Sequence, residues 1–420
     1  MSEAPFRAVV SHPSKQGNMY RVPLGALRSG IPTDFLTGFY YRPGDLPWQA
    51  LRLLPAARRD RAVATLERRR LAGLDERVTM VSGPLPELLY RWLGYDAGNA
   101  LHDRLASRWL ARHVRPGSRG IFHGFQESCG RSLATARRRG LVTLLESTLP
   151  PSTLPLVAAE YARLGQPWTG PSAPSALLLG ELPRADYVVA QSRFAQRSLA
   201  EYGVAPGRVL LMPLGVDVAR FRPAPPAAAG AARPFRVLFA GQMSVRKGVH
   251  HLLEAWSRLD LPDAELLFAG APRDAYIQDL LKRQRGRVRP LGFVPHARLH
   301  EVYQQADLFV FPSLAEGGVY VIYEALACGL PCIVSANAGS AVRDGTEGFV
   351  LPVGDVAALA ERIAALAADP AARRRMAEAA RARAEHFSWE NFYRRIGLMY
   401  RAAVARGGAP FDAPLDLFER

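Results

Sequence analysis

The chain has 420 residues, of which 49% are hydrophobic, and it carries a formal net charge of +16 at pH 7. This length exceeds one typical domain and suits two. The apolar fraction excludes a disordered chain, and the lack of a short Gly and Pro period excludes a fibre. The positive charge indicates an anionic partner (a membrane surface, a nucleic acid or a phosphorylated ligand), although an arginine-rich proteome explains it equally well.

Two features bear on the location of the protein. No run of about eighteen apolar residues occurs, and the first residues lack the pattern of a secretion signal. The cysteines Cys129, Cys328 and Cys332 form no CxxC pair, and their odd number argues against a disulfide framework. We therefore expect buried free cysteines, no membrane-spanning helix and a cytoplasmic location.

The first half of the chain alternates strand and helix signals. The expected strands are 6–11, 34–41, 120–123, 141–145 and 185–190. The expected helices are 51–71 with a break at Pro55, a stretch that ends near residue 140, and 192–202. This alternation predicts a parallel sheet covered by helices.

A stretch rich in Pro and Ala at 222–234, RPAPPAAAGAARP, predicts an extended linker. A second alternating series follows it. Its expected strands are 235–240, 264–269, 307–311, 332–335 and 348–351. Its expected helices are 248–259, 319–328, and three that begin near Val356, at Pro370 and after Ser388. We therefore expect two α/β domains, at 1–205 and 206–387, joined by a hinge.

A pair of carboxylates marks the second domain. Glu316 follows an expected strand, and Glu324 lies one to two turns inside the next helix. Glycines between them permit a ligand to approach the backbone, and the first amides of the helix have no intrahelical acceptor, which favours a phosphate. These intervening positions are Gly317, Gly318, Val319 and Tyr320. If only the two carboxylates are considered, a structural interpretation is favoured over a ligand site. In that interpretation Glu316 is a charge at the N-terminus of the helix, and Glu324 lies on its solvent-exposed face.

Two cations precede a helix in the same domain. Arg246 and Lys247 stand before Gly248, after an expected strand, and the ends of parallel strands are where ligands bind in open α/β sheets. The planar guanidinium of an arginine and the ammonium group of a lysine both suit a diphosphate. The alternative interpretation is a basic surface loop without a ligand. A further expected loop, 288–294 with Leu291, would border a nucleotide base.

Several motifs in order carry a family resemblance. Residues 240–248, the block PSLAEGGVYVIYEALACGLP at 312–331, the segment 344–352, and Ser192 with 213–223 resemble the GT4-type family of retaining glycosyltransferases. The resemblance covers about residues 185–402. It implies a GT-B fold, in which two Rossmann-like parallel-sheet domains face a cleft. It also implies that the last helix, 388–406, crosses back onto the N-terminal domain.

The resemblance implies roles for individual residues. Glu316 would bind the donor sugar and Glu324 the ribose, while amides at Gly318, Val319 and Tyr320 would meet the sugar or the phosphates. Lys247, helped by Arg246, would neutralise the diphosphate leaving group. Gly17, in the first loop, would leave room for the pyrophosphate.

The chain departs from the family pattern at three places. Gln242 stands where an Arg is frequent, and Gly318 where a Phe is frequent. Glu146 occupies the place of a frequent His, and we expect it to follow a strand and face the cleft. His123 is a second cleft candidate, with a structural role equally favoured.

No metal or cofactor is expected, because the nine histidines show no ligand spacing and no DxD-like triplet is visible. The expected function is transfer of a hexose-type sugar from a nucleotide diphosphate, such as UDP or GDP, to a glycan or lipid-linked acceptor. Peripheral contact with an anionic membrane is a further expectation. The alternative is a non-catalytic protein that binds nucleotide sugars. A dinucleotide oxidoreductase lacks its GxGxxG turn, and a nucleic-acid partner is supported by charge alone.

Overall fold

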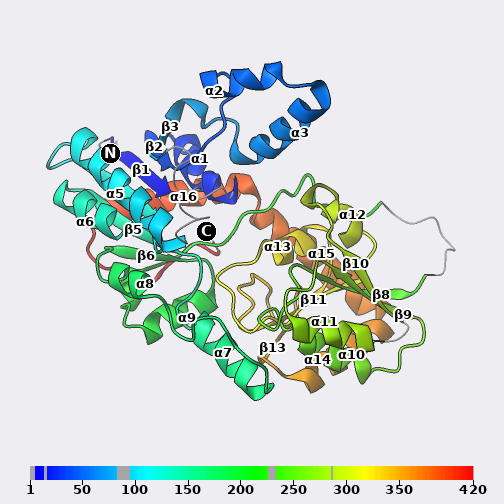
Figure 1. Ribbon diagram of the computed structural model, residues 1–420. Coiled ribbons are helices and arrows are strands. Elements are labelled where there is room, and N and C mark those ends of the chain that lie inside the picture. Colours follow the sequence, from blue (N-terminus) through cyan, green and yellow to red (C-terminus); the bar gives the residue numbers. More distant parts are fainter. Residues whose placement is uncertain (1–4, 14–16, 83–94, 226–232, 285–286, 420) are drawn as a thin grey trace.

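The computed structural model describes residues 5–13, 17–82, 95–225, 233–284 and 287–419. It contains two parallel sheets, each covered by helices, which lie side by side in Figure 1. The α/β class and the two-sheet architecture expected from the sequence are confirmed.

The first sheet has eight strands in the order β14-β7-β6-β5-β4-β1-β2-β3, and every neighbouring pair is parallel. Its central strands are buried on both faces, as continuous apolar runs predict. The strands are β1 (Arg7–His12), β2 (Thr33–Thr37), β3 (Val78–Met80), β4 (Gly120–Phe125), β5 (Val142–Ser147), β6 (Tyr187–Ala190), β7 (Val209–Leu211) and β14 (Leu415–Asp416).

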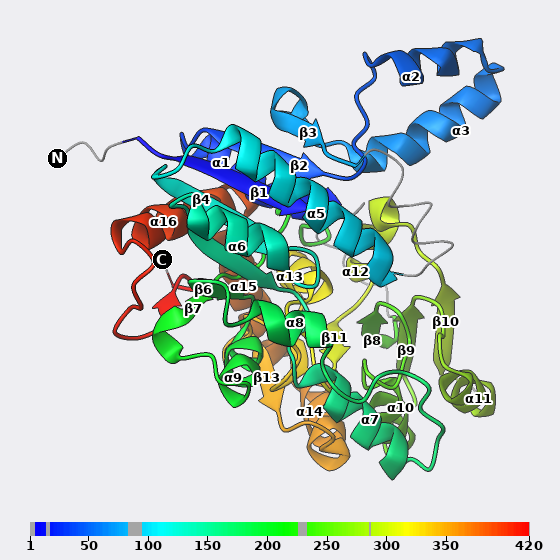
Figure 2. The ribbon, with the colours of Figure 1, turned by 60° about the vertical axis from the view of Figure 1, so that its left-hand side comes forward.

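Helices and short 3-10 turns connect these strands. They are η1 (Gly17–Tyr20), α1 (Arg21–Arg28), α2 (Leu46–Gln49), η2 (Ala50–Leu53), α3 (Ala56–Leu66), η3 (Glu67–Arg69), η4 (Asp75–Arg77), α5 (Tyr95–His113), α6 (Gly130–Arg138), α7 (Thr153–Arg163), α8 (Ala176–Glu181), α9 (Arg193–Glu201) and η5 (Pro206–Arg208). The segment α2 to α3 projects away from the body of the domain in Figures 1 and 2. The helix expected over 51–71 is broken, as expected, at Pro55.

The second sheet has six parallel strands in the order β10-β9-β8-β11-β12-β13. The strands are β8 (Phe235–Ala240), β9 (Ala264–Ala269), β10 (Val288–Gly292), β11 (Leu308–Phe311), β12 (Cys332–Ser335) and β13 (Gly348–Leu351). The helices around it are α10 (Val249–Ser257), α11 (Ala275–Arg283), η6 (His296–Arg298), α12 (Leu299–Tyr303), α13 (Tyr320–Ala327), α14 (Val356–Ala368) and α15 (Pro370–His386). Asp369 caps α15 with Pro370 at the first helical position, as the sequence predicts.

The last helix, α16 (Trp389–Ala405), returns to the first domain, as the GT-B resemblance implies. It packs against α1, where Gly25 leaves room for Ile396 and Tyr393, and where Gly397 faces Ser29. Figure 2 shows it beneath the strands of the first sheet. A side chain at either glycine would push the two helices apart.

Two boundaries differ from those expected. The strand β7 pairs with β6 in the first sheet, so the domain boundary expected at residue 206 is wrong and lies further along the chain. The linker expected at 222–234 falls partly on residues 226–232, which lie outside the described residues. Residues 288–294, expected as a loop, begin with β10, which is paired with β9 along one edge of the sheet.

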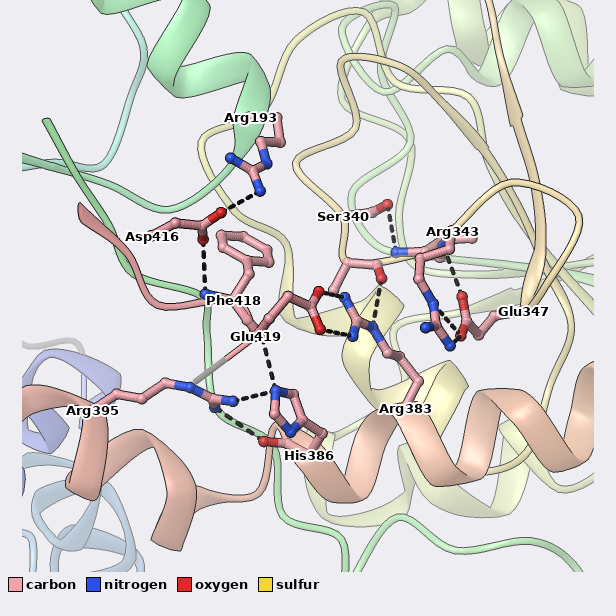
Figure 3. A network of polar contacts seen from close by, with 12 residues as sticks. Arg193, Ser340, Arg343, Glu347, Arg383, His386, Arg395, Asp416, Phe418 and Glu419 are labelled. Atoms are coloured by element: carbon pink, nitrogen blue, oxygen red, sulfur yellow. Dashed lines mark hydrogen bonds and ion pairs between the residues drawn. The ribbon is translucent and has the colours of Figure 1, made fainter. Parts of the chain in front are cut away.

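The C-terminal tail joins both domains. Its strand β14 extends the first sheet beside β7, and Asp416 pairs with Arg193. Glu419 makes two hydrogen bonds, of 2.7 and 3.0 Å, with Arg383 on α15, and His386 meets the carbonyl of Phe418 at 2.8 Å (Figure 3). The tail therefore anchors a helix of the second domain to the edge of the first sheet.

Two expectations from composition are tested by the structure. The three cysteines are buried and free, as expected. Among the described residues, no helix is both long and apolar enough to cross a membrane.

Candidate functional site

Glu316 is the centre of a buried charge cluster. Its Oε2 lies 2.6 Å from Arg246 Nη1, and its Oε1 lies 2.6 Å from Lys247 Nζ. The hydroxyl of Ser313 donates to the same Oε1 at 2.9 Å. Burial lowers the pKa of Lys247, whereas the adjacent carboxylate opposes this shift. The structure thus brings together the three charged residues that the sequence placed in separate loops.

Local backbone geometry explains this convergence. Gly248 adopts a positive φ of 70° at the start of α10, with the carbonyl of Pro312 where a side chain would stand. The loop after β8 can therefore lie directly against the loop after β11. The amide of Leu314 donates to the carbonyl of Arg246 at 2.8 Å, which locks the two loops together.

The glycine pair after Glu316 lies against the first domain, a contact that the sequence did not indicate. At Gly317 a side chain would meet the carbonyl of Thr148, which belongs to the first domain. At Gly318 it would meet Gln191 and Leu214 at 3.0 Å. These glycines admit the backbone of the other domain, and not only a ligand. Sequence spacing contains no information on such inter-domain contacts.

The amides at the start of α13 remain candidates for an anion site. The helix begins at Tyr320, with Val319 as its cap residue, and no side chain caps it. Burial raises the pKa of the Tyr320 hydroxyl, and the nearby charge of Glu146 adds to the rise.

Glu324 is held by a residue that sequence reasoning missed. Its Oε1 lies 2.7 Å from His296 Nε2, and Tyr303 donates to its Oε2 at 3.1 Å. The hydrogen bond to Glu324 raises the pKa of His296, whose side chain is 63% exposed. A cavity of about 250 Å³ between the domains adjoins this pair. Its lining includes Arg21, Arg70, Asp217, Arg220, Tyr320 and Trp389.

Glu146 and His123 lie in one buried chain of hydrogen bonds. Glu146 Oε2 is 3.0 Å from His123 Nε2, and His123 Nδ1 is 2.9 Å from the Tyr400 hydroxyl of α16. Gln191 donates to Glu146 Oε1 at 2.8 Å. The expectation that Glu146 follows its strand is wrong, because it lies within β5 and is 5% exposed. The network ties β4, β5 and the residue that follows β6 to the returning helix.

Gln242 is paired with a second residue that sequence reasoning missed. Arg273 Nη1 donates to its Oε1 at 3.2 Å. Both side chains line a cavity of about 690 Å³ between the domains, together with Arg246. Gln242 also lines a smaller cavity of about 330 Å³ within the second domain.

The smaller cavity adjoins the segment in which Leu291 is expected to border a base. Its lining includes Phe293, Val294 and Val321, whereas Leu291 lies on β10 and is not part of it. The positions after the strand, and not the strand itself, border this space. Gly17 begins η1 after residues 14–16, which lie outside the described residues.

A third cluster brings two histidines and a carboxylate together between the domains. Glu160 Oε1 of α7 lies 2.7 Å from His250 Nε2 and 3.1 Å from His251 Nε2, both on α10. One carboxylate and two imidazoles form a donor set that Zn²⁺ accepts. Arg163, however, donates to both oxygens of Glu160, at 2.7 and 2.9 Å. The carboxylate of Glu160 is thus already held by Arg163 and the two histidines, as a polar contact between the domains.

Burial and hydrogen bonding shift the pKa values of this cluster. It lowers the pKa of His251 to about 4, so the imidazole is neutral near pH 7. The hydrogen bond from Arg163 is the largest cause of a lowered pKa at Glu160.

Comparison with known proteins agrees with this architecture. The family described as glycosyl transferases group 1 matches residues 226–383. A D-inositol 3-phosphate glycosyltransferase from Catenulispora acidiphila is 34% identical over 332 residues, covering 72% of this chain and 77% of that protein. A glycogen synthase from Mycobacterium tuberculosis is 32% identical over 212 residues, covering 48% of this chain and 50% of that protein.

Solved structures show the same fold. Sucrose-phosphate synthase from Thermosynechococcus elongatus superposes with a TM-score of 0.65 at 21% identity, covering 95% of this chain and 99% of that one. The Anabaena protein HepE in complex with UDP superposes with a TM-score of 0.63 at 16% identity, covering 94% and 100%. The chain therefore has the GT-B architecture and belongs to the family of glycosyl transferases group 1.

Proposed function

We propose that this protein transfers a hexose-type sugar from a nucleotide diphosphate to a glycan or lipid-linked acceptor, with retention of configuration and without an essential metal. The observation that carries the proposal is the Glu316 cluster. It places a carboxylate and two cations at the carboxyl ends of β8 and β11, beside the start of α13. Ligands bind at such strand ends in open parallel sheets.

In this proposal Lys247 and Arg246 stabilise the charge that develops on the leaving diphosphate. Both cations already face one carboxylate, so the donor would enter a site where they are positioned in advance. Glu316 would then accept hydrogen bonds from donor sugar hydroxyls, and Glu324 from the ribose. The amides near Val319 and Tyr320 would meet the phosphates.

The cavity of about 330 Å³ is the proposed base site. Its lining, with Gly241, Gly270, Phe293 and Val294, combines backbone with apolar side chains, and it follows three adjacent strands of the second sheet. A flat aromatic base suits such a lining. UDP and GDP sugars are the proposed donors, and the match to a UDP complex of HepE supports the first of these.

The proposed location is the cytoplasmic face of a membrane in a bacterium, in the synthesis of surface glycans or glycoconjugates. The projecting segment from α2 to α3 supports membrane contact. It carries Arg52, Arg58, Arg59 and Arg61 around Leu53, whose exposed fraction is 87%. An apolar residue among arginines suits an anionic surface. Flotation with vesicles of increasing phosphatidylglycerol content tests this membrane contact. Binding that does not increase with the content of anionic lipid would contradict it.

The decisive experiment is a thermal-shift panel of UDP, GDP and ADP sugars with the wild type and Glu324→Ala. One nucleotide should stabilise the wild type, and the variant should lose most of that shift. Transfer or hydrolysis of the same donor would establish catalysis. Donor binding without turnover would instead favour the alternative, a non-catalytic protein that binds nucleotide sugars. Gln242 and Glu146, where the chain departs from the family pattern, are the residues that support this alternative.

A further inference from the structure

A cavity of the cleft lies beside the donor site described above and shares Gln242 and Arg246 with it. It measures about 690 Å³ and has one wall from each domain. The first wall is α7 with the segments before and after it, including Leu149, Tyr161, Trp168 and Gly170. The second wall includes Gln242, Arg246, Arg273, Asp274 and Tyr276. Its size suits a small saccharide, because ligand pockets commonly measure about 300–1,000 Å³.

This cavity reaches the Glu316 cluster. Arg246 lines it and also lies 2.6 Å from Glu316 Oε2. Leu149 lines it from the other domain and follows Thr148, whose carbonyl lies against Gly317. A ligand in the cavity would therefore have one end beside the proposed site of transfer and the other against the first domain.

The two arginines in the cavity differ in their hydrogen-bond partners. Arg246 is paired with the buried carboxylate of Glu316. Arg273 donates to the neutral amide oxygen of Gln242 at 3.2 Å, and among the described residues no carboxylate lies within salt-bridge distance of it. The neighbouring Asp274 accepts instead from the amide of Val245 at 2.7 Å. Within the described part of the chain, Arg273 therefore has no carboxylate partner, and an anionic ligand could pair with it.

The opposite wall offers a fixed aromatic face. Trp168 packs on Tyr161 with ring centroids 4.8 Å apart, and its indole N–H donates to the carbonyl of Pro171 at 3.2 Å. Gly170 lets the loop fold against the indole, where a side chain would clash with it. The ring is therefore held in place while still lining the cavity. An aromatic ring in this position can stack against the C–H groups of a pyranose. Pockets that orient a ligand commonly combine such rings with a few charged groups.

We propose that this cavity is an acceptor subsite for an anionic saccharide, whose ring lies on Trp168 and whose carboxylate or phosphate pairs with Arg273. The inference rests on the proposed function, since it concerns the acceptor of the same transfer. A uronic acid and a sugar phosphate share this chemistry, and they are separate arms of the test.

The first test measures binding and needs no turnover. Methyl glucuronoside, glucose 6-phosphate and the neutral methyl glucoside are titrated into wild type, Arg273→Ala, Arg273→Lys, Trp168→Ala and the control Arg283→Ala. Arg283 is an exposed arginine on α11 outside the cavity. We expect at least one anionic ligand to bind at least tenfold more tightly than the neutral one. Arg273→Ala should remove that preference, Arg273→Lys should retain part of it, and Arg283→Ala should retain all of it. Trp168→Ala should weaken all three sugars.

The second test uses transfer. With the donor found in the nucleotide panel, Arg273→Ala should raise the KM for the preferred anionic acceptor about tenfold, while the KM for the donor stays within twofold. An increase in the donor KM, or equal losses for neutral and anionic acceptors, would overturn the proposal. So would titrations in which the wild type shows no preference for an anion. If no nucleotide sugar binds at all, the proposed function fails, whereas the saccharide titrations still decide the ligand of this cavity.

Discussion

Glu160 Oε1, on α7 of the first domain, lies 2.7 Å from His250 Nε2, on α10 of the second domain. Figure 2 shows α7 extending from the first domain toward α10. His251 lies 3.1 Å from the same oxygen, so one carboxylate joins the two domains at the far side of the cleft from α16. Both histidines are nearly buried, so this contact is shielded from water between the two domains.

The first prediction concerns pH. The folded pKa of His251 is lowered to about 4, so between pH 6.5 and 4 the unfolded chain binds a proton that the folded protein does not. Stability is therefore full above pH 6.5 and is lost as the pH falls toward 4, by at most about 1.4 kcal/mol per pH unit. Glu160, whose pKa is also lowered, adds a loss in the same direction below about pH 4.5.

Urea unfolding of wild type and His251→Gln between pH 7.5 and 4.5 measures this loss. The variant should show a shallower decline, since it has no imidazole to protonate. His113→Gln, at an exposed position of α5, is the control and should follow the wild type. Parallel curves for wild type and His251→Gln would contradict the prediction. Other groups, such as Glu181 with a pKa raised by burial to about 7, cancel in this comparison.

The second prediction concerns metals. Arg163 occupies both oxygens of Glu160, so Zn²⁺ should not bind tightly to the wild-type cluster. We expect EDTA to leave the rate of sugar transfer unchanged within twofold. Arg163→Ala exposes the complete donor set, and Zn²⁺ should then raise the melting temperature of this variant by several degrees. A fall in wild-type activity with EDTA, restored by a divalent ion, would show that the proposed independence from metal is wrong.

The third prediction separates catalysis from stability in the Glu316 cluster. Lys247→Met removes one cation but leaves Glu316 with Arg246 and Ser313. It should lower kcat about 100-fold or more, with little change in the free energy of unfolding. Glu316→Ala leaves the buried amine of Lys247 without its carboxylate, and this should cost about 3 kcal/mol of stability as well as activity. Steady-state kinetics and chemical unfolding of both variants measure these effects separately. Equal losses of stability in Lys247→Met and Glu316→Ala would refute the roles assigned to the two residues.

The fourth prediction concerns the domain contact at Gly317. A methyl group there would meet the carbonyl of Thr148, so Gly317→Ala should force the domains apart and lower kcat at least tenfold. Small-angle scattering should show a larger radius of gyration than for the wild type. Gly180→Ala is the matched control, because nothing lies within 4 Å of the added methyl group and the residue is in α8. That change should be neutral or slightly stabilising.

The sequence by itself determined many of the elements, above all in the second domain, and the order of the motifs. The strands of the second sheet at 235–240, 264–269, 332–335 and 348–351 coincide with their predicted bounds, because each is a short apolar run bounded by turn residues. The start of the helix after Asp369 followed in the same way from local capping. The sequence placed Glu316 and the two cations Arg246 and Lys247 after strands of one parallel sheet, whose ends meet at one edge. It did not predict that they pair with one another.

One missed element had a readable signal. The helix α7, which carries Glu160, buries Thr153, Val157 and Tyr161, and this spacing of four residues is that of a helix face. Pro155 and the flanking prolines obscured the pattern, although proline is tolerated in a first turn.

Only the tertiary structure decided which side chains meet across the chain. His123 with Tyr400 and Glu160 with His250 are separated by 277 and 90 residues, and no local pattern specifies such pairs. The same holds for Arg273 beside Gln242, which belong to loops after neighbouring strands. Local propensity and periodicity act over a few residues and define helices and strands. The partners of buried charges depend on how two whole domains pack, where desolvation requires each charge to find a polar neighbour.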